Sequence, residues 1–169
     1  ELGMNSESQP LTENEAKQMR ASDEIGLRII KSYQLMLDFY GIELVNTQTG
    51  EVKRHSNNYV QRFAHLNRSF HNYLRITRIC KCLGIMGFEH YKEQLLKFFI
   101  HEAFEHGTLT AVQDSLVRFW VPTCRNQNKM KELDQLIQKV SKNKRIVNRE
   151  GRDGYGDEHG QNNWATRLY

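Results

Sequence analysis

Apolar side chains recur at helical spacing through most of this 169-residue chain, in segments that end at a glycine or a proline. Spacings of three and four residues place such side chains on one face of an α-helix, where they can be buried together. The pattern predicts helices within residues 13–22, 23–40, 57–70, 71–83, 87–106, 110–121 and 127–141. We therefore expect an all-α fold, a compact bundle of six or seven helices.

Two local signals add detail at the N-terminal end of this bundle. Thr12 followed by Glu15 forms a capping box, which predicts where the first helix begins. After a helix stop at Gly41, residues 42–45 and 51–54 flank a polar turn and predict one small β-hairpin. Because an isolated two-stranded ribbon is only marginally stable, we expect the hairpin to pack against helices.

The apolar pattern also divides the chain into a helical domain and a polar tail. After Lys142 apolar residues nearly vanish, and the last residues are rich in Gly, Asp, Asn and basic side chains. Such a composition cannot bury enough surface to fold. We expect a helical domain over residues 1–141 and a basic, disordered tail over residues 142–169. Because the first residue is not Met, we also expect the chain to be a fragment of a longer protein.

Neither a membrane span nor a disulfide framework fits this sequence. A membrane-spanning helix needs about 20 apolar residues, and the longest apolar run, Leu83–Phe88, has six. Any membrane association should therefore be peripheral at most. Three cysteines are an odd number, which argues against a disulfide framework. These features favour the reduced environment of the cytosol or nucleus.

Histidine and cysteine are numerous enough for a metal site, but their spacing is wrong. Cys80 and Cys82 are two apart on a predicted helix and point in different directions. His101 and His106 are five apart, about 140° round an α-helix, whereas a zinc-binding helix places its two His four apart. A catalytic thiol needs a base within hydrogen-bond reach in the fold. Cys124 has no His close in sequence, and nothing in the sequence favours a His near it in space. We expect no metal, no cofactor and no enzymatic activity.

The most unusual feature of the charge distribution is a long run without acids. The chain carries a net charge of +4, yet the thirty-seven positions from Val52 to Phe88 contain no Asp or Glu. Seven Lys or Arg and three His residues fall within this acid-free run. Two interpretations stay open. Either other helices supply the balancing acids, or the run presents a positive surface to an anionic ligand or an acidic partner.

Five residues of the acid-free run are candidates for a ligand-binding surface. Arginine presents a planar fork of donors that suits carboxylate and phosphate groups. Aromatic residues alternate with these bases, as in nucleic-acid binders, but their helical spacing favours core packing. The candidates are Arg62, Arg68, His71, Arg75 and Arg78.

Several stretches of the sequence carry a resemblance to known proteins: Ser32–Ile42, His71–Ile79, and residues within Arg62–Asn67, Leu83–Phe88 and Leu95–Phe99, with Gly3–Asn5 and Pro10–Thr12 near the start. Together they resemble the conserved domain of the opioid growth factor receptor family. The resemblance also implies that an upstream part of the domain is missing. The sequence HNYLRITRI at residues 71–79 is the most specific part. The resemblance runs from about residue 3 to about residue 125 and weakens after that.

This resemblance implies a helical receptor that is unrelated to the seven-helix opioid receptors. It implies binding of the pentapeptide Met-enkephalin, negative regulation of cell proliferation, and a cytoplasmic, nuclear and perinuclear location. A site for such a peptide needs an apolar cleft, an acid for the amine, and an Arg such as Arg75 or Arg78 for the carboxylate. The alternative is a basic helical module that binds nucleic acid or an acidic protein.

Overall fold

Helices and one β-hairpin make up the computed structural model, which describes residue 7 and residues 9–153, with side chains up to residue 143. The predicted all-α fold with one small hairpin is confirmed. The elements are α1 (Glu13–Arg20), α2 (Asp23–Phe39), β1 (Ile42–Leu44), β2 (Val52–Arg54), α3 (Tyr59–Leu66), α4 (His71–Ile85), α5 (Glu89–Ile100), α6 (Gln113–Ser115) and α7 (Gln127–Asp153). Two π-helical turns, η1 (His101–Glu105) and η3 (Leu116–Trp120), and two 3₁₀ turns, η2 (Thr110–Val112) and η4 (Val121–Thr123), link α5 to α7.

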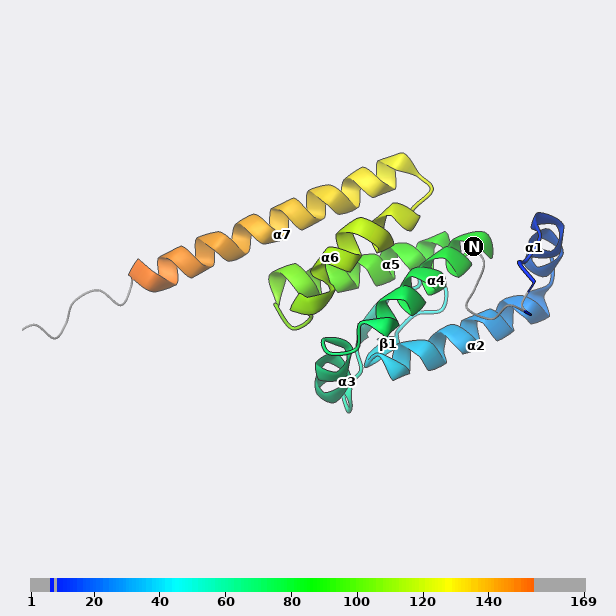
Figure 1. The fold of residues 1–169 in the computed structure, drawn as a ribbon, viewed down its shortest axis with the longest axis horizontal. Helices are drawn as coiled ribbons and strands as arrows, with labels where there is room; N and C mark the ends of the chain where they lie inside the picture. Colours follow the sequence, from blue (N-terminus) through cyan, green and yellow to red (C-terminus); the bar gives the residue numbers. More distant parts are fainter. Residues whose placement is uncertain (1–6, 8, 154–169) are drawn as a thin grey trace, which may run out of the picture.

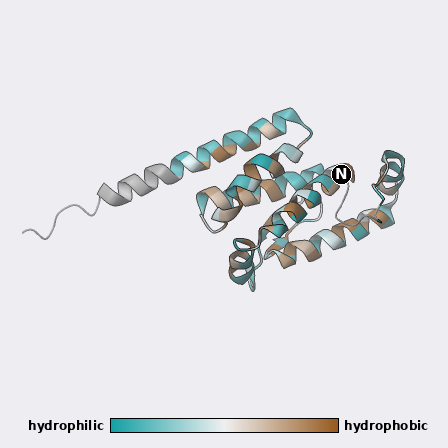
Figure 2. Ribbon diagram, viewed as in Figure 1, coloured by the Kyte–Doolittle hydropathy of each residue, from teal (hydrophilic) through white to brown (hydrophobic). Residues whose placement is uncertain are grey.

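The helices lie side by side in layers (Figure 1). Helix α2 forms one edge, α4 and α5 lie in the middle, and α7 runs along the opposite edge. Helix α7 is mostly hydrophilic (Figure 2), but it buries Leu133 and Val140 against the rest of the molecule. Its C-terminal part extends past the other helices in Figure 1. The core therefore lies between α2 and α7, around α4 and α5.

Helix α5 and the turn η3 carry the centre of this core. Phe99 and Trp120 are fully buried, with ring centroids 4.9 Å apart, and the Trp120 indole donates a hydrogen bond to the Tyr73 carbonyl at 3.1 Å. Phe70 and Phe119 fall at apolar positions of the helices predicted over residues 57–70 and 110–121, which places them inward by spacing, but both are more than half exposed. Phe70 is outside α3, and Phe119 lies in the π-helical turn η3, so neither follows the α-helical period that predicted it.

The predicted start of α1 and the end of α2 are confirmed. Thr12 caps α1 reciprocally with Glu15, as a capping box requires. Gly41 ends α2 with φ +78°, a conformation that favours glycine. A Cβ at this position would lie 2.8 Å from both the Arg62 Cβ and the Tyr59 Cα, so Gly41 also allows α3 to pack closely.

The hairpin is antiparallel, with Ile42 opposite Arg54 and Leu44 opposite Val52. Arg54 attaches it to the helices, because its guanidinium makes two hydrogen bonds of 2.7 Å to the Glu102 carboxylate in η1. The expected support from helices is therefore present.

Two sequence-based helix assignments are wrong in their ends. Gly84 does not stop α4; it is buried within the helix, and Gly87 with φ +85° follows the helix end instead. Helix α7 continues past residue 141, where the sequence predicts its end, to Asp153. The rest of the predicted tail, residues 154–169, lies outside the described residues. No described helix is long and apolar enough to cross a membrane.

Candidate functional site

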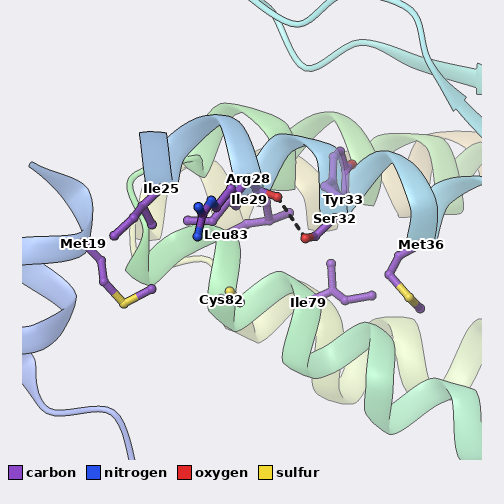
Figure 3. Close-up of a pocket in the computed structure, with 10 residues that line it drawn as sticks. All are labelled: Met19, Ile25, Arg28, Ile29, Ser32, Tyr33, Met36, Ile79, Cys82 and Leu83. Atoms are coloured by element: carbon purple, nitrogen blue, oxygen red, sulfur yellow. Dashed lines mark hydrogen bonds between the residues drawn. The ribbon is translucent and has the colours of Figure 1, made fainter. Parts of the chain in front are cut away.

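An apolar groove of about 480 Å³ opens between α1, α2 and α4. Figure 3 shows Met19 of α1 at one end and Met36 of α2 at the other, with Cys82 and Ile79 of α4 between them. The wall on α2 is formed by Ile25, Ile29 and their neighbours Arg28, Ser32 and Tyr33, and Leu83 completes the lining. The helical spacing of the apolar residues of α2 predicts that they all belong to the core. Tyr33 and Leu37 are indeed buried, whereas Ile25, Ile29 and Met36 are only partly buried and line the groove.

A second cavity of about 490 Å³ continues the groove along the same helices. It shares Met36 and Ile79 with the first and adds Leu35 and Phe39 from α2. From Ile25 to Phe39 the lined part of α2 is about 21 Å long, at roughly 1.5 Å per residue. We call the two cavities together the α2–α4 groove. Arg28 near its Ile25 end is paired with Glu24, so we turn to the arginines at its Phe39 end.

Two of the five candidate residues line this end: Arg75 and Arg78 of α4. Arg62 of α3 joins them through Phe39, because its guanidinium lies over the Phe39 ring at 5.7 Å from the centroid. His65 also packs edge-on against this ring, at 6.2 Å. The structure therefore brings together three arginines that belong to two helices and lie up to sixteen positions apart in sequence.

The other two candidates are not part of the groove. Arg68 is exposed in the connection between α3 and α4, and it lines neither cavity. His71 is exposed one turn before Arg75 on the same stripe of α4, but it does not line the groove either.

The balance of charge differs along the acid-free run. At its start, Lys53 lies 3.4 Å from Glu43, Arg54 lies 2.7 Å from Glu102, and His55 lies 3.6 Å from Asp38. The Glu102 carboxylate raises the pKa of Arg54, mainly through its hydrogen bonds. Further along, four arginines have no carboxylate within 4.0 Å among the residues that the structure describes. They are Arg62, Arg68, Arg75 and Arg78.

Among the residues that the structure describes, no carboxylate lines either cavity. The acid of α2 that is closest in sequence to Phe39 is Asp38, which instead accepts a hydrogen bond of 2.9 Å from the Asn58 amide and faces His55. At the other end, Glu24 is paired with Arg28 at 2.6 Å. The groove therefore offers an apolar wall and a cation, but the acid expected for a peptide amine is not part of its lining.

Two polar residues beside Arg75 escaped the sequence-based search. Asn72, fully buried on α4, accepts a hydrogen bond of 3.0 Å from Arg75 through its side-chain oxygen. Tyr40, which caps the C-terminus of α2, is 3% exposed. Its burial raises the pKa of its hydroxyl to about 12, and the charge of nearby Arg75 opposes this rise. Tyr40 was missed because its helical spacing assigns it to the core, and only its hydroxyl group could have marked it as a polar residue of interest.

The angle of about 140° predicted between His101 and His106 is wrong, because these residues do not lie on an α-helix. His101 begins the π-helical turn η1 and His106 follows it, and the His106 amide donates to the His101 carbonyl at 2.9 Å. In such an i→i+5 turn, residues five apart lie on nearly the same face of the helix. Even so, no group of three or more His, Cys, Asp or Glu within the described residues could hold a metal ion.

Comparisons with known proteins give this fold a family. The model of the opioid growth factor receptor conserved region matches residues 1–150. Mouse opioid growth factor receptor-like protein 1 is 40% identical over 139 residues, which cover 82% of this chain and 30% of the relative. Human opioid growth factor receptor is 41% identical over 131 residues, which cover 76% of this chain and 19% of the relative.

The chain spans less than a third of the length of these relatives. No solved structure matches it. The family model covers well over half of the chain and extends beyond residue 125, the position after which the resemblance was expected to weaken. On this match, the chain belongs to the opioid growth factor receptor family.

Proposed function

We propose that this chain is a receptor-like domain that binds a short peptide of the Met-enkephalin type in the α2–α4 groove. Its relatives are named as opioid growth factor receptors and receptor-like proteins, which supports a receptor over an enzyme. The observation that carries the proposal is an apolar groove that ends in Arg75 and Arg78, two arginines that form no ion pair with any acid of the described residues.

The size and chemistry of the groove suit such a peptide. Met-enkephalin has Tyr, Phe and Met side chains and a free carboxylate, and an extended pentapeptide is about 17 Å long. This is shorter than the lined part of α2, which is about 21 Å. Met19 and Met36 give the wall flexible side chains that can adapt to aromatic rings. The arginines at the Phe39 end can pair with the peptide carboxylate.

The wider roles rest on the family resemblance. We propose that peptide binding by this domain contributes to negative regulation of cell proliferation. We also propose a cytoplasmic, nuclear and perinuclear location, with membrane association that is peripheral at most.

Filling the groove tests the proposal. Ser32 is exposed and lines the groove, so Ser32→Trp places a large ring in the binding space without disturbing the core. Gln34→Trp adds the same ring at an exposed position of α2 outside the groove lining. We expect calorimetry to show saturable Met-enkephalin binding that Ser32→Trp weakens at least about tenfold and Gln34→Trp leaves unchanged. Equal binding by both variants, or no binding by the parent chain at high micromolar peptide, would contradict the proposal.

A second candidate function is binding of an acidic protein or nucleic acid. Arg62, Arg68, Arg75 and Arg78 support it, because they meet no acid in the described part of the chain and leave positive charge that another macromolecule could neutralise. Counterion release makes such binding fall steeply with salt. An oligonucleotide whose affinity for the chain drops about a hundredfold between 50 and 200 mM salt, as four phosphate contacts predict, would favour this function. A peptide held in the apolar groove should respond far less.

A further inference from the structure

The α2–α4 groove has unbalanced charge at one end only. At the Phe39 end it is lined by Arg75 and Arg78, which have no carboxylate within 4.0 Å in the described part of the chain. Near the other end, Arg28 is neutralised by Glu24 at 2.6 Å. A ligand that lies along the groove therefore meets net positive charge at one of its own ends and none at the other.

The described lining between these ends offers almost no free hydrogen-bonding group. The Ser32 hydroxyl already donates to the Arg28 carbonyl at 2.9 Å (Figure 3). Tyr33 packs its ring against Tyr91, with centroids 5.5 Å apart, and its hydroxyl is buried. The Cys82 thiol is only a weak donor, and the backbone groups of α2 and α4 are engaged within their helices. Such a wall suits a hydrocarbon chain, which has no polar group that needs a partner.

The length of the groove matches that of a long acyl chain. The lined part of α2, from Ile25 to Phe39, is about 21 Å long. With carbon–carbon bonds of about 1.5 Å, an extended sixteen-carbon chain is about 20 Å long. The two cavities of about 480 and 490 Å³ share Met36 and Ile79, so one chain can pass between them without leaving the apolar lining.

We propose that the α2–α4 groove is a binding site for a long-chain fatty acid, whose carboxylate pairs with Arg75 and Arg78 and whose acyl chain lies along the apolar wall towards Met19. Arg75 uses one N–H on the Asn72 oxygen at 3.0 Å, which leaves its other donors for a ligand. This inference goes beyond the proposed function and does not depend on it. Because both ligands occupy the same groove, a bound fatty acid excludes the peptide.

Displacement of the fluorescent fatty acid cis-parinarate tests the site. We expect its fluorescence to rise saturably with the parent chain and palmitate to reverse the rise. Ser32→Trp should weaken palmitate binding at least about tenfold, whereas Gln34→Trp, outside the lining, should leave it unchanged. Laurate is four methylenes shorter than palmitate and should bind at least about tenfold more weakly. No saturable rise, equal weakening by both Trp variants, or equal binding of laurate and palmitate would overturn the site.

The methyl ester of palmitate tests the charged end, because it keeps the chain and removes the negative charge. With both ligands delivered from cyclodextrin, the parent chain should prefer the acid by about tenfold or more, as for hydrogen bonds to a charged group. In the double variant Arg75→Gln, Arg78→Gln the preference should fall below about twofold. Arg68→Gln removes a charge outside the groove and should keep the full preference. Equal binding of acid and ester by the parent chain, or a preference that survives the double variant, would overturn the pairing with these arginines.

Spin-labelled stearates test the direction of the chain. Met19 and Met36 lie at opposite ends of the first cavity (Figure 3), and NMR can follow their methyl resonances. A nitroxide near the carboxylate should broaden the Met36 methyl more, and a nitroxide near the methyl end should broaden the Met19 methyl more. The reverse order would overturn the orientation. Equal broadening of both methyl groups by both labels would overturn the extended position along the groove.

Met-enkephalin separates failure of this site from failure of the proposed function. A chain that binds palmitate but no Met-enkephalin would overturn the proposed function alone, and a chain that binds Met-enkephalin but no palmitate would overturn the fatty-acid site alone. Where both bind, palmitate at about nine times its dissociation constant should weaken the apparent peptide affinity about tenfold. An unchanged peptide affinity would overturn the shared use of the groove.

Discussion

The two parts of the acid-free run both carry bases and no acids, yet their electrostatic outcomes differ. At the start of the run, Lys53 and Arg54 on strand β2 reach acids elsewhere in the fold, Glu43 on the partner strand and Glu102 in η1. Further along, the arginines of α3 and α4 have no carboxylate within 4.0 Å among the described residues. We call these the paired region and the open region.

The difference teaches that a run without acids does not predict a positive surface. Glu102 is forty-eight positions from Arg54, and η1 brings it beneath the hairpin. On α4, the exposed stripe with Arg75 and Arg78 faces α2, whose residues at that end are the apolar Leu35, Met36 and Phe39. The partner element therefore decides whether a base is neutralised.

The largest effect should come from breaking the paired region with Glu102→Ala. Glu102 is 3% exposed and accepts hydrogen bonds from both Arg54 and Thr108, so its loss leaves a partly buried guanidinium without its carboxylate. We expect the free energy of unfolding in urea to fall by about 3 kcal/mol. Glu43→Ala is the control, because its exposed pair with Lys53 should contribute less than about 0.5 kcal/mol. Similar losses in both variants would show that the Arg54–Glu102 pair does not hold the hairpin.

Adding an acid to the open region should convert it into a paired one. Leu35 is 66% exposed and lines the same cavity as Arg75 and Arg78, so Leu35→Glu places a carboxylate beside them. We expect peptide affinity to fall by about tenfold, while stability changes by less than about 0.5 kcal/mol. The comparison is with Leu27→Glu, at an equally exposed position two turns away on α2. An equal loss of affinity in both variants would show that the change in net charge, and not a carboxylate in the groove, weakens binding.

Cysteine reactivity distinguishes the open groove from the core beside it. Cys82 is exposed in the groove lining, whereas burial raises the pKa of the Cys80 thiol to about 12. We expect iodoacetamide to modify Cys82 before Cys80, as measured by mass spectrometry. Peptide at five times its dissociation constant should slow the reaction of Cys82 about sixfold. Unchanged labelling of Cys82 under saturating peptide would place the peptide elsewhere.

The smallest effect concerns α1, which carries Met19 at the far end of the groove. Hydrogen bonds from Thr12 lower the pKa of Glu15 below its ordinary value of 4.5. A lowered pKa in the folded state means that Glu15 stabilises α1 above pH 4.5, and that this contribution is lost as the pH falls through the lower, folded-state value. The amide resonance of Thr12 should follow this titration. In Glu15→Gln the same resonance should not respond to pH in this range, and an unchanged response would exclude the capping carboxylate as its source.

Local signals predicted much of the fold because they depend only on neighbouring residues. The capping box at Thr12 and the positive φ at Gly41 are properties of four or five consecutive positions, and both are confirmed. Gly84 shows the limit of such signals. Its role as a helix stop is wrong because its missing Cβ serves packing: a methyl group there would lie 2.8 Å from the Lys92 Nζ.

Lys92 also shows what spacing alone does not reveal. It is fully buried within α5, where its ammonium pairs with Glu89 at 2.6 Å and donates to the Thr123 carbonyl at 2.8 Å. Lys92 lies four positions from both Phe88 and Leu96, so helical spacing places it on the apolar face of α5. Spacing does not reveal that the Thr123 carbonyl, thirty-one positions away, accepts a hydrogen bond from its ammonium. The π-helical turns escaped prediction for a related reason, since one extra residue per turn leaves no mark in composition.

The candidate site divides in the same way. Residue type and helical spacing were enough to place Arg75 and Arg78 on an exposed stripe of α4, because side-chain direction follows from backbone geometry within one helix. Which arginines meet an acid and which apolar residues form a groove depend on contacts between elements distant in the chain. Those contacts arise from packing, where each helix face is defined by the neighbour it meets. Neither Arg68 nor Arg75 meets a carboxylate within the described residues, and only their positions relative to α2 place Arg75 in the groove lining and Arg68 outside it.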